Sequence, residues 1–396
     1  MSDLSKPTAS TDAPPSPPAS VPLFLASLAA WRATNDATAL RSLPEHALDS
    51  IVKVSVRTID DARTGQTLGT EREGTGIVIE ARHAAARHSD AVVVGDTPDE
   101  ADDQYAEDTR ADATDQYASG EEEYDTREPG TLILTIGYLV IEAQSVLVMT
   151  RDNRVLPATV IGFDHATGFG LLRTGARAAR RPLKLGDSSA VREMQPLYFL
   201  AHEGAGGASA AAIVSRRPFV GYWEYMLSEA LFTVPGRAEH SGAALVDGEG
   251  RLIGVASLWV GDALDQGTAL PGNMFVPIDL LKPLLPDLIA HGRDPAPARP
   301  WLGIYTAEHD SKVVVAHVME RSPAQRVGIR EGDVIIAVAT EPVATPREFY
   351  EKLWASGTAG TKVRLRVLRG RLVLDALVSS IDRIEFFRPW TVRRAQ

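Results

Sequence analysis

The sequence predicts a mostly β protein in which short strands, separated by hairpin turns, form a barrel or a sandwich. Short β-branched or alternating runs recur at residues 51–56, 145–149, 156–163 and 252–256. Runs of this length and spacing are typical of those two architectures. Residues 151–154 (RDNR) and 246–250 (VDGEG) have the composition of hairpin turns. A chain of 396 residues has room for two to three domains.

The composition excludes several classes of protein. An apolar fraction of 44% is ordinary for a soluble globular chain. The absence of cysteine excludes disulfides, thiolate zinc sites and a cysteine nucleophile. Glycine-rich phosphate loops and metal-ligand spacings are also absent, so we expect no cofactor and no bound metal. The net charge of −11, without a basic stripe, argues against a nucleic acid partner.

Two segments precede the predicted strands. Residues 1–20 are rich in Pro, Ser, Ala and Thr, which is typical of a disordered tail. Residues 21–40 open with an apolar stretch too short to cross a bilayer, and we predict an N-terminal helical segment there. A signal peptide has a basic region before its apolar stretch, and this stretch has none. We therefore expect a cytoplasmic protein without a membrane span.

An acidic run interrupts the strands between residues 80 and 131. Residues 90–128 contain fifteen acidic residues and two arginines, so the remainder of the chain is close to neutral. Such a run is typical of a solvated, self-repelling loop, and we predict a disordered insert at about 88–130. The alternative is an arm that docks a basic partner or covers a cleft as a pseudo-substrate. The run lacks the spaced aspartates of a calcium-binding loop.

The most informative motif surrounds Ser241. Residues 239–245 (EHSGAAL) resemble the nucleophile loop of the HtrA/Deg family of trypsin-like, chymotrypsin-fold serine proteases, where the pattern is Gly-Asn-Ser-Gly-Gly-Pro-Leu. The resemblance places Ser241 at the position of the nucleophile. Glu239 stands where the family has a glycine whose N–H faces the oxyanion. A carboxylate adds negative charge beside a developing negative charge, so Glu239 is expected to disrupt the oxyanion hole.

The same resemblance locates the other two positions of the catalytic triad. Residues 131–140 (TLILTIGYLV) resemble the family's strand that ends in Asn-Asn-His-Val-Val, which places Tyr138 at the histidine. Residues 160–173 (VIGFDHATGFGLLR) resemble the segment with the catalytic aspartate, which places Gly168 there. A phenol has an ordinary pKa near 10 and is a poor base at neutral pH. Loss of one triad member typically costs about four to six orders of magnitude in rate, so we expect Ser241 to be inactive.

Other polar residues could still form a rearranged site. The candidates near Ser241 in the expected fold are Asp164, His165, His202 and His240. His240 adjoins Ser241, and neighbouring side chains of an extended segment point to opposite faces. His165 would have to swing several ångströms to reach the serine. We interpret these histidines as partly exposed loop residues and Ser241 as a residue retained in a tight turn.

Three further segments keep the order of the HtrA/Deg family. They are residues 185–189 (LGDSS), 254–257 (GVAS) and 275–285 (FVPIDLLKPLL). The resemblance resolves the choice of architecture to two six-stranded antiparallel barrels within residues 41–293. It also implies a homotrimer, since the family commonly trimerises, and makes the periplasm the alternative to the cytoplasm.

A second domain follows a stiff linker at residues 294–300 (DPAPARP). Residues 322–336 (SPAQRVGIREGDVII) resemble a PDZ domain of the HtrA type, which we assign to residues 301–384 and follow with a C-terminal tail at 385–396.

The PDZ resemblance implies that peptides are bound by strand addition. The expected peptide-binding residues are Leu302, Gly303, Ile304 and Tyr305. In such a loop, backbone N–H groups capture a C-terminal carboxylate, the next strand pairs with the peptide, and a helix at 346–353 closes the groove. Gly303 allows close approach of the ligand. The alternative is that this domain only packs against the barrels.

These features predict an HtrA-like pseudoprotease that binds C-terminal or unfolded peptide segments without cutting them, and that regulates or scaffolds a partner protease. One alternative is an active serine endopeptidase in which a displaced histidine serves Ser241. Another is a structural subunit that forms a hetero-oligomer with an active paralogue.

Overall fold

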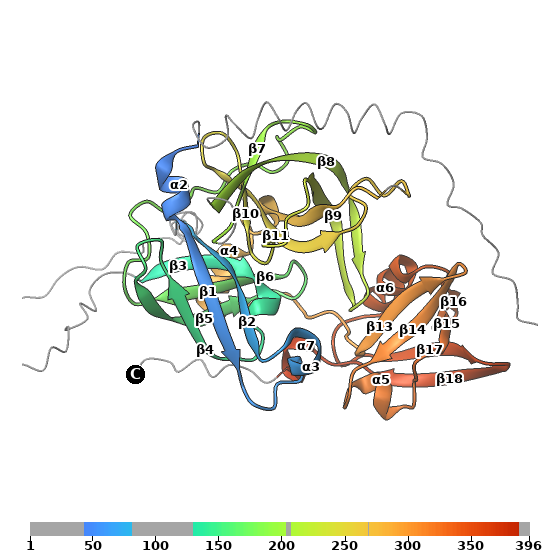
Figure 1. Cartoon of the computed structure of the whole chain (residues 1–396). Coiled ribbons are helices and arrows are strands. Elements are labelled where there is room, and N and C mark those ends of the chain that lie inside the picture. The colour runs from blue at the N-terminus through green and yellow to red at the C-terminus, as the bar shows by residue number, and fades with distance from the viewer. Residues whose placement is uncertain (1–42, 81–129, 203–206, 268, 388–396) are drawn as a thin grey trace, which may run out of the picture.

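The computed structural model describes residues 43–80, 130–202, 207–267 and 269–387. Three predicted segments lie outside the described residues: the tail at residues 1–20, the helical segment at 21–40 and the acidic insert at about 88–130, apart from its last residue. The described chain forms two closed β-barrels and a C-terminal domain, as Figure 1 shows. The predicted pair of six-stranded antiparallel barrels is confirmed.

The first barrel closes in the order β1-β2-β3-β6-β5-β4. Its strands are β1 (Ile51–Thr58), β2 (Glu71–Val78), β3 (Thr131–Ile136), β4 (Ala143–Met149), β5 (Val155–Phe163) and β6 (Phe169–Thr174). Alternation along β1 buries Val52, Val54 and Val56, because successive side chains of a strand point to opposite faces. Three short helical elements flank these strands: α2 (Glu45–Asp49), α3 (Gly65–Leu68) and the 3₁₀ turn η2 (Gly137–Leu139).

The second barrel closes in the order β10-β11-β12-β9-β8-β7. Its strands are β7 (Leu197–Leu200), β8 (Ala208–Gly221), β9 (Tyr225–Val234), β10 (Ala244–Val246), β11 (Leu252–Val260) and β12 (Gly272–Pro277). The turn η4 (Ile278–Leu280) and helix α4 (Leu285–His291) lead out of the barrel. Strands β8 and β9 form a long hairpin that extends beyond the barrel to the C-terminal domain (Figure 1).

The C-terminal domain is a strongly bent sheet with one main helix. Its strands are β13 (Ile304–His309), β14 (Lys312–Val318), β15 (Val334–Val338), β16 (Glu341–Pro342), β17 (Lys362–Arg369) and β18 (Leu372–Ser379). Its helices are α5 (Pro323–Arg326), α6 (Pro346–Ala355) and α7 (Arg383–Phe386). Helix α6 begins at the N-cap Thr345, whose side chain accepts from the N–H of Glu348, while the Glu348 carboxylate accepts from the N–H of Ala344. Its apolar face buries Phe349, Tyr350 and Leu353.

An apolar cluster joins the C-terminal domain to the first barrel. It contains Ile141 and Phe163 of the barrel region, Trp301 and Met319 of the C-terminal domain, and Phe386 and Phe387. The ring centroids of Trp301 and Phe386 are 4.5 Å apart. Helix α7 spans the boundary that the sequence suggested between residues 384 and 385. The chain stays packed beyond residue 384 because Phe386 and Phe387 bury their rings in this cluster.

Replacing Phe386 with Ala should lower the free energy of unfolding by about 3 kcal/mol, because the ring is only 3% exposed and its loss leaves a cavity. Urea unfolding followed by tryptophan fluorescence measures the change. Leu372→Ala is the control, since that side chain is 67% exposed and should change stability by less than about 0.5 kcal/mol. Equal unfolding midpoints for both variants would show that α7 does not dock as described.

Candidate functional site

Ser241 lies where the two barrels meet. Its carbonyl accepts a hydrogen bond of 2.8 Å from the N–H of Thr75 in β2 of the first barrel. The next residue, Gly242, has φ +76°, and a Cβ there would overlap the Thr75 carbonyl. The loop before β10 therefore needs glycine at this position, both for its left-handed backbone and for the close approach of the barrels.

The side chain beside the Ser241 hydroxyl is that of Tyr138. Tyr138 Oη lies 2.9 Å from Ser241 Oγ and 3.0 Å from the carbonyl oxygen of Ser257 in β11. The buried guanidinium of Arg72 holds the η2 turn that carries Tyr138, because its Nη1 donates to the carbonyls of Tyr138 and Ile141 at 2.8 and 3.0 Å. The structure thus brings together two residues that are 103 positions apart in the sequence.

The hydrogen bonds of Tyr138 determine what it can do for Ser241. A phenol carries one hydrogen, and the Ser257 carbonyl can only accept. When Tyr138 donates to Ser257, the bond between the two hydroxyls requires Ser241 to donate to the phenol oxygen. Burial raises the pKa of Tyr138 to about 12, with the Ser241 hydrogen bond acting in the opposite direction. The phenol is therefore neutral at physiological pH and is a very weak acceptor of the serine proton.

A side chain at position 168 would be strained and closely packed. The φ of Gly168 is +84°, and a Cβ would lie 3.3 Å from Tyr225 Oη. Tyr225 reaches this place from the start of β9 and donates a hydrogen bond of 2.7 Å to the Thr167 carbonyl. The Gly168 carbonyl in turn accepts a bond of 2.6 Å from the N–H of Gly137. The backbone and the Tyr225 ring therefore occupy the space around this position.

A cavity of about 260 Å³ opens beside Ser241. Its lining includes Lys53, Glu73, His202 and Glu239. Glu239 forms an ion pair of 3.6 Å with Arg237, and Lys53 pairs with Glu73 at 2.8 Å. The pairing with Arg237 partly offsets the negative charge that Glu239 brings to this cavity. Of the sequence candidates for a replacement base, His202 is the one that lines this cavity together with Ser241.

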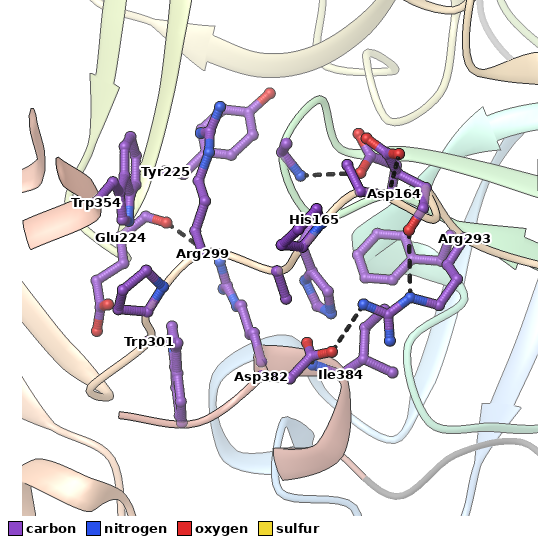
Figure 2. Close-up of a pocket in the computed structure, with 18 of the residues that line it drawn as sticks. Asp164, His165, Glu224, Tyr225, Arg293, Arg299, Trp301, Trp354, Asp382 and Ile384 are labelled. Atoms are coloured by element: carbon purple, nitrogen blue, oxygen red, sulfur yellow. Dashed lines mark hydrogen bonds and ion pairs between the residues drawn. The ribbon is translucent and has the colours of Figure 1, made fainter. Parts of the chain in front are cut away.

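The other candidate residues have different surroundings. His165 packs between the rings of Phe163 and Phe387, with centroid distances of 4.2 and 5.7 Å. It lines a second cavity, of about 250 Å³, between the first barrel and the C-terminal domain (Figure 2). Burial and nearby arginines hold the pKa of His165 well below its usual range. Asp164 caps its own turn by accepting from the N–H and hydroxyl of Thr167.

His240 is half-buried, and its Nδ1 has no hydrogen-bond partner among the described residues. Burial lowers the pKa of its imidazole. The ring therefore remains neutral more readily than an exposed histidine.

The predicted peptide-binding loop already holds a carboxylate. The N–H groups of Gly303 and Ile304 donate to Glu224 Oε1 at 2.7 and 2.8 Å. The N–H of Leu302 donates to Oε2 at 3.1 Å. Tyr305 directs its ring against Tyr222, with a centroid distance of 5.6 Å. Sequence reasoning did not identify Glu224, because no motif marks a single carboxylate at a hairpin tip.

Candidate metal sites are not evident in the part of the chain that the structure describes. Within residues 43–80, 130–202, 207–267 and 269–387, His, Asp and Glu form no group of three or more that could hold an ion. Over the same ranges, no helix is both long and apolar enough to span a membrane.

Comparisons with known proteins match both parts of the chain. A family model of the trypsin-like peptidase domain matches residues 124–255, and one of the PDZ domain matches residues 300–379. Serine endoprotease DegS of Haemophilus influenzae is 24% identical over 250 residues, which cover 60% of this chain and 70% of the relative. Periplasmic pH-dependent serine endoprotease DegQ of Escherichia coli is 25% identical over 280 residues, which cover 65% of this chain and 59% of the relative.

Periplasmic serine endoprotease DegP of Salmonella typhimurium is 26% identical over 258 residues, covering 60% of this chain and 51% of the relative. The chain thus spans between half and seven tenths of the length of these three relatives. A solved structure of the HtrA-type protease AlgW with decapeptide has a TM-score of 0.45 and 17% identity, covering 87% of this chain and 97% of that chain.

Substituting Gly168 with Ala should lower the free energy of unfolding by about 1–2 kcal/mol, because a non-glycine residue is strained at φ +84°. Gly175→Ala is a matched control, since a Cβ there would meet no atom within 4 Å. Thermal unfolding of the two variants measures the difference. Equal stability would show that position 168 tolerates a side chain and could accommodate an aspartate.

Proposed function

Because the chain joins a trypsin-like peptidase domain to a PDZ domain and has serine proteases of the HtrA/Deg family as relatives, we propose that it is an HtrA-like pseudoprotease that binds peptides without cleaving them. The observation that carries the proposal is the hydrogen bond between Ser241 Oγ and the phenol of Tyr138. In an active site of this type, the corresponding partner takes the serine proton.

Two features support the absence of catalysis. Burial raises the pKa of the Tyr138 phenol to about 12, so the phenol is neutral at physiological pH and has little capacity as a general base. Gly168 supplies no carboxylate to orient a base, and Tyr225 lies against it. The relatives carry names of active serine proteases, at identities of 24–26%. At such low sequence identity, the residues around Ser241 are a better guide to the activity of this chain than the names of its relatives.

One observation favours the second candidate function, an active serine endopeptidase. His202 lines the same cavity as Ser241, next to Glu73 and Lys53. A histidine in this place could act as a displaced base if it moved to within hydrogen-bond reach of the serine. The phenol of Tyr138 would then have to give up its bond to Ser241.

The partners that we propose are peptide or protein segments, which fits the PDZ domain. We propose either a homotrimer or a hetero-oligomer with an active paralogue, and light scattering of the purified protein tests the homotrimer. The names of DegQ and DegP place those relatives in the periplasm, which supports the periplasm over the cytoplasm for this chain.

The purified protein should leave unfolded β-casein intact over several days, and Ser241→Ala should behave identically. Mass spectrometry of the products detects slow cleavage. Cutting that is present in the parent and absent in Ser241→Ala would overturn the pseudoprotease proposal. In that event His202→Ala tests the base directly, because loss of cutting in this variant as well would assign the role to His202.

A fluorophosphonate probe should leave Ser241 unlabelled up to pH 9. With a pKa of about 12, only about one Tyr138 phenol in a thousand is ionised at that pH. An active serine protease in the same reaction shows that the probe is competent. An adduct on Ser241, located by peptide mass spectrometry and growing as the pH rises, would mean that a base does activate the serine.

A further inference from the structure

The carboxylate of Glu224 is bound as a PDZ domain binds the end of a peptide. Three consecutive backbone N–H groups, those of Leu302, Gly303 and Ile304, converge on its two oxygens at 2.7–3.1 Å. Glu224 is buried, with 5% of its surface exposed. Convergent backbone N–H groups of this kind are the chemistry that captures a C-terminal carboxylate. The three donors are therefore already satisfied by a group of the same chain.

The residues next to Glu224 also occupy the groove. The N–H of Thr306 in β13 donates a bond of 2.8 Å to the carbonyl of Tyr222, which is a backbone contact of the type that an added strand would make. From α6, Tyr350 Oη donates to the Gly221 carbonyl at 3.0 Å and accepts from the Glu224 N–H at 3.1 Å. The hairpin tip thus lies between the strand and the helix that border the predicted peptide groove.

Apolar and charged contacts fix the hairpin on either side of its tip. Val220 and Met226 pack against the core of the C-terminal domain. Arg383 of α7 donates to the Glu224 carbonyl at 3.4 Å. Figure 2 shows Glu224 among the residues that line the cavity containing His165, together with Trp301, Trp354 and Arg299. Burial raises the pKa of Glu224 to about 7, whereas the three N–H groups act in the opposite direction.

We propose that the tip of the β8–β9 hairpin, residues 221–224, is the resting ligand of the PDZ groove, and that a peptide with a free C-terminal carboxylate binds only by displacing it. This inference rests on the proposed peptide-binding function. The two ligands exclude each other because one set of N–H donors cannot serve two carboxylates at once. Glu224 itself has a positive backbone dihedral, φ +53°, at the tip of the hairpin.

Competition of this kind lowers the apparent affinity for peptides. A protein whose binding-competent state is a small fraction of the population binds its ligand more weakly by that fraction. Any change that weakens the Glu224 contact should therefore tighten peptide binding. If the groove were open, its affinity for peptides would not change when Glu224 is substituted.

The test compares peptide binding by the full chain before and after Glu224→Gln. The probe is a fluorescein-labelled pool of decapeptides with apolar residues at the last three positions and a free C-terminal carboxylate, and fluorescence anisotropy reports binding. The same pool with amidated C-termini is the negative control. We expect Glu224→Gln to bind the carboxylate pool at least about tenfold more tightly than the parent. Equal affinities would overturn the proposal and leave the peptide-binding function intact.

Glu229→Gln is the matched control, because Glu229 lies on the same hairpin with an exposed side chain and pairs with Arg216. It removes the same charge without touching the groove, so its affinity should equal that of the parent. An equal gain from Glu229→Gln would attribute the effect to net charge and overturn the proposal.

Amide hydrogen exchange tests the contact without any peptide. The N–H groups of Leu302, Gly303 and Ile304 should exchange at least about tenfold faster in Glu224→Ala than in the parent, because their shared acceptor is gone. Unchanged exchange would overturn the resting-ligand proposal. If no protein binds the pool but exchange accelerates as expected, the peptide-binding function fails while the internal contact stands.

Discussion

The arrangement of the C-terminal domain on the barrels depends on one buried carboxylate, that of Glu224. A buried backbone N–H without an acceptor costs roughly 1–3 kcal/mol, and the loop at Leu302–Ile304 presents three of them. Glu224 satisfies all three from a hairpin of the second barrel. The apolar cluster around Trp301 and Phe386 then ties the same domain to the first barrel. The loop at Leu302–Ile304 is consequently part of an internal interface.

The two sites of interest are linked through adjacent residues. Tyr225 follows Glu224 in the chain, and its hydroxyl bonds to the Thr167 carbonyl beside Gly168. The hairpin therefore places a carboxylate in the loop at Leu302–Ile304 and an aromatic ring beside Gly168.

The side-chain contact at Ser241 is a hydrogen bond to the hydroxyl of Tyr138. Tyr138, from the first barrel, forms hydrogen bonds with the Ser241 hydroxyl at the junction of the barrels and with the Ser257 carbonyl in the second barrel. Its side chain therefore links the two barrels. Its burial favours the neutral phenol. Because burial keeps the phenol neutral, it favours the hydrogen bond with Ser241 and makes the phenol a weak acceptor of a proton.

The sequence by itself predicted short strands in a barrel or a sandwich, and its resemblance to the HtrA/Deg family resolved that choice to the two barrels that the structure has. Alternating apolar residues predict strands such as β1, because successive side chains of a strand point to opposite faces. The segments around Tyr138, Gly168 and Ser241 keep the order that they have in the HtrA/Deg family. Only the tertiary structure decided that Glu224 fills the PDZ loop, that Tyr138 bonds to Ser257 and that His165 packs between two phenylalanines. The physical reason is sequence distance: Glu224 meets its N–H donors across 78–80 residues, and Tyr138 meets Ser257 across 119. Contacts of single side chains over such separations leave no periodicity or motif in the sequence.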